Sequence, residues 1–562
     1  MITIQYQTQH LSMRFFMLML VLFFFQAGFG LMIAAQQADP TLLAGVLNFN
    51  IMRAQHLNLG IIWILSGFIG TILFVGPLLS NRELAAPWLI KFLFIALIAV
   101  TIWNVATQVL AAQGIAGWWL GQPWFQEGLE YLEAGRIADI IILVGFAILC
   151  YIVLRTFPPV RQWNEIHWGL GLGVIALTLV WVFGLFFIER LDLQEYFRWY
   201  VVHYWVEGVW EVIHITLVGF LLVLMFKADV KSVGYAVFWG ITLVWLSGLI
   251  GNAHHYFWIG TPEFWQFWGS LFSALEPLPL VFCFWHIYLD AHQDRKPLEN
   301  APAFYFILGS VILEQVGAGI LGFTMTFALT NVWSHGTWVT PSHAHLALFG
   351  TFGMLGIASA YYAVPLMRKI SFDQRIGKLA FWLVFIGMLG IAFAFAIGGT
   401  IQVFMYRTLG LDWFGGDVFP AMQFYKSLVV LFGVIFAVGA GLLIFDLLTM
   451  GLRTPSLARA PEARVSRLSP PETGWSSVLG RFEAGMWLMT MWIFGAIITL
   501  GLLSFNLPIV QAGDPTLPYL LAWVGYPGLL LTTLLFVWRF LSSLGARCEQ
   551  PIATPNLGAA AA

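Results

Sequence analysis

The sequence predicts an all-α polytopic membrane protein with a twelve-helix core and about two extra transmembrane helices at its C-terminal end. Composition and the length of the apolar runs carry this prediction. Of the 562 residues, 60% are hydrophobic and only 10% are charged, and the mean hydropathy is +0.83. A soluble domain contains about 25% charged residues. This chain therefore has too little polar side-chain surface to cover a globule of its size in water.

The apolar runs are long enough to cross a bilayer. A transmembrane helix needs about 20 apolar residues, and the chain contains about fourteen such runs, one of them centred near Leu278. Because lipid offers no partners to backbone polar groups, segments of this length are expected to be helices. The first run, from Met13 to about Ala35, is longer than the apolar part of a secretory signal, so we expect it to be retained.

Loop charges predict the orientation of the chain in a cell inner membrane. Loops after even-numbered spans are rich in Arg and Lys, whereas loops after odd-numbered spans carry mainly Asp and Glu. By the positive-inside rule, both termini lie in the cytoplasm. We divide the chain into a core (1–450), a Pro-, Ser- and Arg-rich cytoplasmic linker (451–480), a two-helix appendage (481–545) and a tail (546–562). The net charge of −2 offers no basic field for nucleic acid.

Six of the twelve histidines are expected at similar depth, near the outer face of the membrane. They are His56, His203, His254, His255, His343 and His345. Neutral imidazole is the commonest protein metal ligand, and scattered packing histidines have no reason to share one depth. We therefore predict that these six are ligands. We assign the isolated His214, His286 and His292 to hydrogen-bonded helix packing.

The sequence spacing of the six histidines indicates which of them can bind the same cofactor or metal. His343 and His345 are two residues apart on a helix, so about 200° of rotation separates them and they can serve groups on opposite flanks. His203 and Glu207 are four apart and share a face. The adjacent His254 and His255 can both reach a metal that lies between their helix and the helix of His203.

Three carboxylates lie inside the apolar runs: Glu207, Glu211 and Glu276. A carboxylate at such a position costs about 2.5–3.5 kcal/mol on insertion scales. Metal coordination or proton transfer would offset that cost. The three cysteines are too far apart for a thiolate metal site, and the chain has no C-x-x-C-H motif for a covalently attached haem.

Several segments together resemble the catalytic subunit of nitric oxide reductases, in the haem-copper oxidase superfamily. They are residues 203–211 (HYWVEGVWE), 251–260 (GNAHHYFWIG), 273–279 (SALEPLP), His335-Gly-Thr through His343-Ala-His345, and the His56-Leu-Asn-Leu segment. The resemblance covers about residues 10 to 450 and implies a haem-copper-oxidase-like core.

The resemblance also implies the cofactors and their ligands. His56 and His345 would ligate a low-spin haem b, and His343 would ligate a high-spin haem b. A non-haem iron would be held by His203, His254, His255 and Glu207, while Glu211 and Glu276 would lie nearby and support its charge and proton supply. Glu130, in an outer loop, would bind a structural calcium, and Glu133 would be linked to proton entry.

The activity that the resemblance implies is the reduction of two NO molecules to N2O and water, as in denitrification. Oxygen-reducing members of the superfamily commonly carry a tyrosine four residues after the first metal histidine, where this chain has Glu207. A hard oxygen ligand favours iron over copper, and we therefore prefer NO to oxygen as substrate. The alternatives are an oxygen-reducing terminal oxidase of the same superfamily and a non-enzymatic, haem-bearing assembly or transport subunit.

The resemblance leaves two possible electron donors. The single-chain, quinol-dependent form of the family carries a cytochrome-like domain ahead of this core, whereas here the core begins almost at the first residue. We therefore expect a separate donor subunit with a cytochrome c or copper domain, in preference to quinol.

Overall fold

The computed structural model describes residues 6–117, 120–128, 133–186, 188–226, 230–278, 281, 300–370, 372–412, 416–452 and 475–548. In this part of the chain all regular structure is helical, and thirteen helices are long and apolar enough to cross a membrane. The prediction of an all-α polytopic membrane fold is therefore confirmed. The remaining predicted span, centred near Leu278, falls partly on residues 279–280 and 282–299, which lie outside the described residues.

Within the described residues, the N-terminal half contains nine α-helices, and two short segments near the histidines have a different helical winding. The α-helices are α1 (Ser12–Ala38), α2 (Phe49–Ser80), α3 (Pro87–Ala112), α4 (Gly135–Thr156), α5 (Glu165–Trp181), α6 (Leu191–His203), α7 (Glu211–Phe226), α8 (Val230–Gly251) and α9 (Glu263–Leu275). The π-helical η5 (Tyr204–Trp210) joins α6 to α7, and the 3-10 turn η6 (Asn252–Tyr256) follows α8.

The C-terminal half continues the bundle. Its α-helices are α11 (Ala301–Leu313), α12 (Gly322–Met325), α13 (Ala328–Ser334), α14 (Val339–Ala344), α15 (Met354–Arg368), α16 (Gln374–Gln402), α17 (Val418–Ala421), α18 (Gln423–Thr449), α19 (Trp475–Ser504), α20 (Pro508–Gln511) and α21 (Thr516–Cys548). Three π-helical segments interrupt the long spans: η7 (Glu314–Leu321), η8 (His345–Gly353) and η9 (Val403–Thr408).

Local side chains explain where α2, the helix that carries His56, begins and ends. Asn48 precedes it and accepts hydrogen bonds from the backbone N–H groups of Asn50 and Ile51, which would otherwise have no partner in the first turn. At the other end Asn81 adopts a left-handed conformation with φ of 51°, which an asparagine tolerates better than most residues. These two caps hold His56 about two turns inside the helix.

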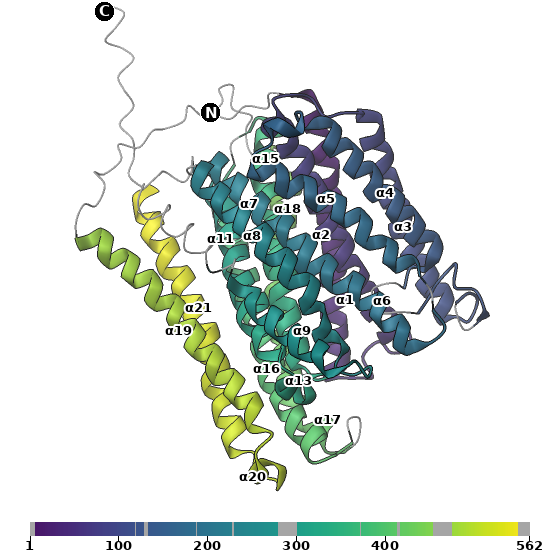
Figure 1. Ribbon diagram of the computed structural model, residues 1–562, viewed down its shortest axis with the longest axis vertical. Helices are drawn as coiled ribbons and strands as arrows, with labels where there is room; N and C mark the ends of the chain where they lie inside the picture. The colour runs from purple at the N-terminus through teal and green to yellow at the C-terminus, as the bar shows by residue number, and fades with distance from the viewer. Residues whose placement is uncertain are drawn as a thin grey trace, which may run out of the picture.

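Burial separates central helices from lipid-facing ones. In the spans Phe49–Ser80 and Val339–Arg368, 89% and 94% of the apolar centre is buried, against 28% in Pro87–Ala112. The two central spans carry His56, His343 and His345. The helix of His56 and the helix of His343 and His345 therefore lie in the interior of the bundle, whereas α3 lies at its periphery (Figure 1).

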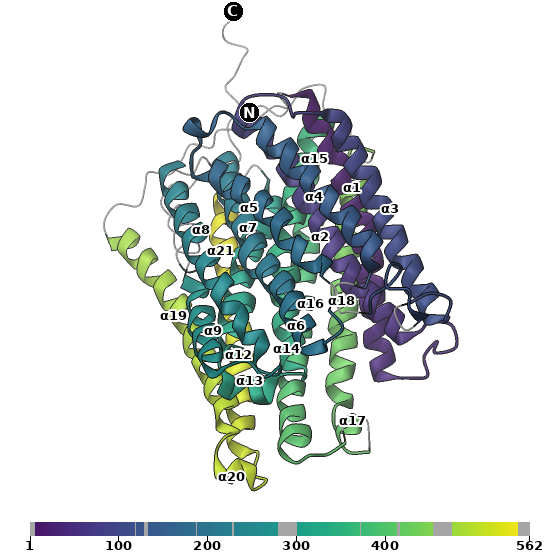
Figure 2. The same ribbon diagram turned by 45° about the vertical axis from the view of Figure 1, so that its right-hand side comes forward.

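The two C-terminal helices form a hairpin on one flank of the bundle. Figures 1 and 2 show α19 and α21 running side by side there, joined at one end by α20. The hairpin packs on α11, α16 and η7. The linker predicted at 451–480 falls largely on residues 453–474, and the tail predicted at 546–562 largely on 549–562; both ranges lie outside the described residues.

Candidate metal and haem centre

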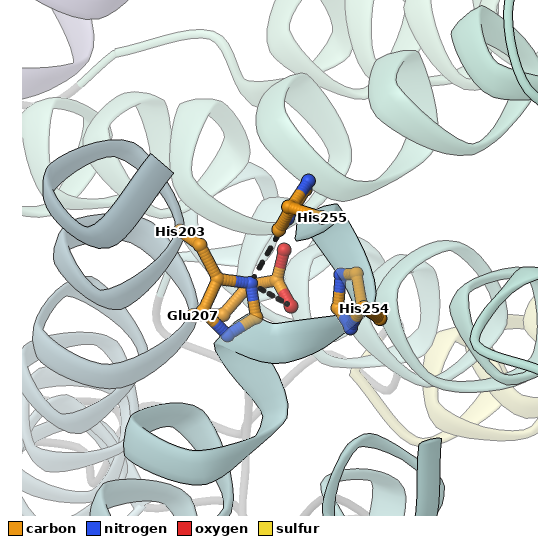
Figure 3. Close-up of side chains that lie close together, drawn as sticks. All are labelled: His203, Glu207, His254 and His255. Atoms are coloured by element: carbon orange, nitrogen blue, oxygen red, sulfur yellow. Dashed lines mark hydrogen bonds and ion pairs between the residues drawn. The ribbon is translucent and has the colours of Figure 1, made fainter. Parts of the chain in front are cut away.

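Four side chains predicted to hold one metal lie together. One ligand atom from each of His203, Glu207, His254 and His255 lies within 4.8 Å of the others, and Figure 3 shows the four side chains facing one another. The Nδ1 atom of His203 is 3.2 Å from a carboxylate oxygen of Glu207 and 3.1 Å from Nε2 of His255. Two ligand atoms with metal bonds of about 2.2 Å lie at most about 4.4 Å apart. The four side chains would therefore have to move only slightly closer together to bind one metal ion.

The hydrogen bonds of His203 and His254 leave one ring nitrogen of each free to face that centre. The Nε2–H group of His203 donates to the carbonyl oxygen of Gly248 at 3.0 Å. His254 Nδ1 is 2.6 Å from the hydroxyl of Ser273, which itself donates to the carbonyl oxygen of Gly251 and must therefore accept from the ring. Such bonds fix the tautomer and orientation of ligating histidines.

His255 is held by stacking. Its ring lies parallel to the indole of Trp199, with ring centroids 4.2 Å apart and 8° between the planes. The local backbone also differs from a regular α-helix, since the π-helical η5 begins directly after His203 and contains Glu207. Isolated π-helical turns occur frequently at functional sites. The fold therefore restrains all three imidazoles and places the carboxylate beside them.

The imidazole rings of His56 in α2 and His345 in η8 lie near each other. Their ring centroids are 6.2 Å apart and the planes differ by 29°. Two imidazoles on opposite sides of one metal, each with a metal–nitrogen bond of about 2 Å, have centroids about 6 Å apart. The Nδ1 atoms are 2.9 Å from the carbonyl oxygen of Gln26 and 2.8 Å from that of Pro341, respectively. This geometry fits the two axial ligands of a haem.

His343 points to a different neighbour. Its Nδ1–H group donates to the carbonyl oxygen of Gly317 in η7 at 2.7 Å, which leaves Nε2 available as a ligand. The side chain interacts electrostatically with Glu207 and His254. The two histidines of this span thus serve opposite sides, as their spacing predicted, and His343 belongs to the side of the four-residue metal cluster.

The other two predicted carboxylates adjoin the cluster. A carboxylate oxygen of Glu276 is 3.9 Å from Nε2 of His203, and Glu276 lies within hydrogen-bonding reach of Glu207. Glu211 is buried, and its Oε2 atom has no hydrogen-bond partner among the described residues. Both carboxyl groups interact electrostatically with Glu207 of the cluster.

The acidic loop between α3 and α4 is described in part. Glu130, the predicted calcium ligand, lies outside the described residues. Glu133 is buried and accepts a hydrogen bond of 2.7 Å from the Asn58 side chain. Nearby, Glu127 pairs with Arg136 at 3.0 Å; burial raises the pKa of the Glu127 carboxyl above its usual value, and the guanidinium opposes that shift.

Several residues that shape this centre were not predicted from the sequence. They are the residues that accept hydrogen bonds from the histidine rings or stack on them: Gln26, Trp199, Gly248, Gly317 and Pro341. Four of them contact a histidine through a backbone carbonyl group. Every residue has such a group, so the amino-acid sequence does not indicate which one accepts the hydrogen bond. Ser273 lies in a segment that carried the family resemblance, so its position could have drawn attention to it.

Comparisons with known proteins agree with this geometry. The family described as Cytochrome C and Quinol oxidase polypeptide I matches residues 10–435. A nitric oxide reductase subunit of Stutzerimonas stutzeri is 30% identical over 472 residues, which is 82% of this chain and 98% of that protein. Cytochrome c oxidase subunit 1 of Thermus thermophilus is 23% identical over 380 residues, 62% of this chain and 64% of that protein.

A solved haem-copper terminal oxidase dimer shares the fold. Its chain aligns with a TM-score of 0.64 at 16% identity, covering 91% of this chain and 93% of that one. Family match and fold agree with the paired and clustered histidines described above. The chain therefore belongs to the haem-copper oxidase superfamily, as a multi-pass membrane oxidoreductase of the cytochrome c and quinol oxidase polypeptide I family that is similar to a nitric oxide reductase subunit.

Proposed function

We propose that this protein is a nitric oxide reductase, which reduces two molecules of NO to N2O and water. The observation that carries the proposal is the carboxylate of Glu207 beside three imidazoles, 3.2 Å from His203 Nδ1. A hard oxygen donor added to three nitrogen donors favours iron over copper. The 30% identity to a nitric oxide reductase subunit, against 23% to a cytochrome c oxidase subunit, supports the same choice.

We assign the cofactors to the residues that fit them. A low-spin haem b would bind between His56 and His345, a high-spin haem b would bind on His343, and His203, His254, His255 and Glu207 would hold a non-haem iron. When bound, these groups supply the electron transfer and the redox chemistry of NO. Calcium binding by Glu130 stays a prediction, because that residue lies outside the described part of the chain.

The protein residues then have three tasks in the reaction. The hydrogen bonds of His203, His254 and His343 hold one ring nitrogen of each toward the centre. The carboxylate of Glu207 contributes negative charge that offsets the positive charge of a bound metal. Glu211 and Glu276, both close to Glu207, bind and release the two protons that the reaction consumes.

The electron donor and the orientation belong to the same proposal. The similar Stutzerimonas protein is named as one subunit of its reductase, which supports a separate donor subunit with a cytochrome c or copper domain in preference to quinol. The alternation of loop charges supports cytoplasmic termini in an inner membrane and a haem centre near the outer face.

Substituting Glu207 tests the proposal. In Glu207→Ala we expect NO turnover to fall by about 10²-fold or more, because a charge-bearing ligand and its contact with His203 are lost. Both haems should remain visible in the absorption spectrum, since no haem ligand is changed. Glu483→Ala, in the C-terminal hairpin, is the control and should leave turnover unchanged. The readouts are NO consumption at an electrode and N2O by gas chromatography.

Two outcomes would contradict the proposal. Wild-type protein that consumes oxygen briskly but forms no N2O from NO would identify an oxygen-reducing terminal oxidase. Unchanged NO turnover in Glu207→Ala, with both haems present, would remove the role given to this carboxylate.

A further inference from the structure

A second buried polar group lies beyond the metal cluster, on α7 and α11 and at the start of η7. It contains His214, Ser310 and Glu314, each at most 1% exposed. His214 is seven residues after Glu207, which is about 10 Å further along the helix. These residues therefore do not touch the metal cluster. The sequence had suggested only a packing role for His214 and had not singled out Glu314.

The hydrogen bonds locate a proton within this group. The Ser310 hydroxyl donates its only hydrogen to the carbonyl oxygen of Thr351 at 2.5 Å. It must therefore accept from Nε2 of His214, which is 2.7 Å away, so Nε2 carries a hydrogen. The other ring nitrogen, Nδ1, is 3.1 Å from Oε1 of Glu314.

The contact between His214 Nδ1 and Glu314 requires one more proton. A neutral imidazole with its hydrogen on Nε2 has only a lone pair on Nδ1. That lone pair and a carboxylate oxygen would repel each other at this distance. A proton on either Nδ1 or the carboxyl group removes the repulsion and makes the contact an attractive one. Neither atom forms a hydrogen bond with any described residue. The His214–Glu314 pair thus holds one transferable proton.

The pair is next to Glu211 of the catalytic centre. Glu211 precedes His214 by three residues on the same face of α7, and it interacts electrostatically with both Glu314 and Glu207. Its Oε2 atom is buried without a hydrogen-bond partner among the described residues, as are Thr351 Oγ1 and both polar atoms of the Gln315 side chain. A buried polar atom without a partner is unfavourable, and internal water normally satisfies such atoms. Bridging water here would connect the pair to Glu211.

We propose that the His214–Glu314 pair is a proton relay that supplies Glu211; this inference rests on the proposed NO reduction. Before transfer, the pair is neutral overall and Glu211 is a carboxylate. In the step, one proton leaves the pair, which becomes an imidazole and a carboxylate, and binds Glu211, which becomes a carboxylic acid. The total charge of the three groups stays at −1. The step needs no oxidant or reductant.

The relay is tested in the purified holoenzyme with Glu314→Gln and His214→Gln, which keep polar side chains of similar size. The matched control is Thr216→Val on the same helix; Thr216 is also buried, and its hydroxyl bonds only the carbonyl oxygen of Val212 in its own helix. We expect kcat for NO to fall at least about 10-fold in both relay variants. The KM should stay unchanged and both haem spectra should be retained.

Two further measurements separate a relay from a structural role. In the double variant, kcat should fall no further than in the slower single variant, because both groups act in one path. Glu314→Asp, which keeps a carboxyl group, should recover part of the lost rate. Redox-induced infrared difference spectra should show a carboxyl band that shifts in D2O and is absent from Glu314→Gln.

Three results would overturn the relay. One is turnover within about twofold of wild type in Glu314→Gln with both haems present. The second is a carboxyl band in the infrared difference spectrum that Glu314→Gln leaves unchanged. The third is loss of a haem in both relay variants while Thr216→Val assembles normally, which would make the role of the pair structural.

Failure of the relay and failure of the proposed function are distinguishable. Wild-type protein that reduces oxygen instead of NO would contradict the proposed function alone. Oxygen reduction also consumes protons, so slowing of that reaction in Glu314→Gln would still support the relay.

Discussion

In five of the six histidines, one ring nitrogen lies within hydrogen-bonding distance of an acceptor that is not part of the proposed metal or haem site. The acceptors are the carbonyl oxygens of Gln26, Gly248, Gly317 and Pro341 and the hydroxyl of Ser273. A packing histidine needs only one partner of any kind, whereas a ligand needs one nitrogen restrained and the other free. This shared arrangement is the strongest structural reason to regard these side chains as ligands.

Removing the Ser273 hydroxyl should weaken metal binding without touching a ligand. In Ser273→Ala, His254 loses the acceptor that fixes its ring, and loss of such a contact typically lowers metal affinity about 10–100-fold. We expect the non-haem iron to be depleted by a chelator at correspondingly lower concentrations, measured as iron per haem. Ser247→Ala is the control, because that buried hydroxyl bonds only backbone carbonyls of its own helix α8. Equal chelator sensitivity in both variants would contradict the orienting role.

The proposed low-spin haem site requires a small residue at position 30, beside His56. A Cβ atom at Gly30 would lie 2.6 Å from Cε1 and 2.8 Å from Nδ1 of His56, whereas one at Gly28 on the same helix meets nothing within 4 Å. Gly30→Ala should therefore displace the His56 ring and perturb the low-spin haem spectrum, with Gly28→Ala as the matched control. The absorption spectrum of the reduced protein measures both. An unaltered low-spin band in Gly30→Ala would show that His56 does not need its present position.

The sequence predicted the relative directions of two side chains when both lie on one helix, because their spacing sets the rotation between them. The two-residue spacing of His343 and His345 predicted that they face opposite sides, and the four-residue spacing of His203 and Glu207 predicted their contact. Glu314 could not be found in this way, because its partner His214 is 100 residues away in the sequence. Contacts between distant helices depend on packing that no local pattern encodes.

Among the helices, the spans were predictable because hydropathy over about 20 residues is a local property. The π-helical segments η5, η7 and η8 were not, although they contain Glu207, Gly317 and His345. No local sequence pattern marks these wider turns. At Gly317, a Cβ atom would lie 2.5 Å from Cβ of Leu346 in η8, so these two segments approach more closely than side chains would normally allow.

The C-terminal hairpin contains none of the predicted ligands. A substitution there can therefore test the packing of the hairpin without changing a ligand of the proposed metal or haem sites. A Cβ atom at Gly528 would clash with the ring of Phe494 on the facing helix. Gly528→Ala should therefore destabilise the packing of α19 on α21 by about 1–3 kcal/mol and lower the thermal stability. Both haem spectra should be retained. Gly441→Ala on α18 is the control, because a Cβ there meets nothing within 4 Å. Loss of a haem in Gly528→Ala alone would show that the hairpin supports the centre.

For the molecule as a whole, the proposed cofactors predict its metal content. Two haems and one non-haem iron give about three irons per chain, with negligible copper, because the oxygen donor Glu207 favours iron. Elemental analysis of the purified complex, corrected for haem in any partner subunit, measures this ratio. One copper and two irons per chain would point instead to an oxygen-reducing oxidase.

The position of the hairpin limits where a membrane-anchored neighbour can attach. Because α19 and α21 already pack on α11, α16 and η7, an anchor helix from a second polypeptide has no direct access to that flank. On the opposite side of the bundle lie α3 and α4 (Figure 2), and only 28% and 33% of their apolar centres are buried. For the donor subunit proposed above, the appendage therefore leaves α3 and α4 as one exposed apolar face on the side away from the hairpin.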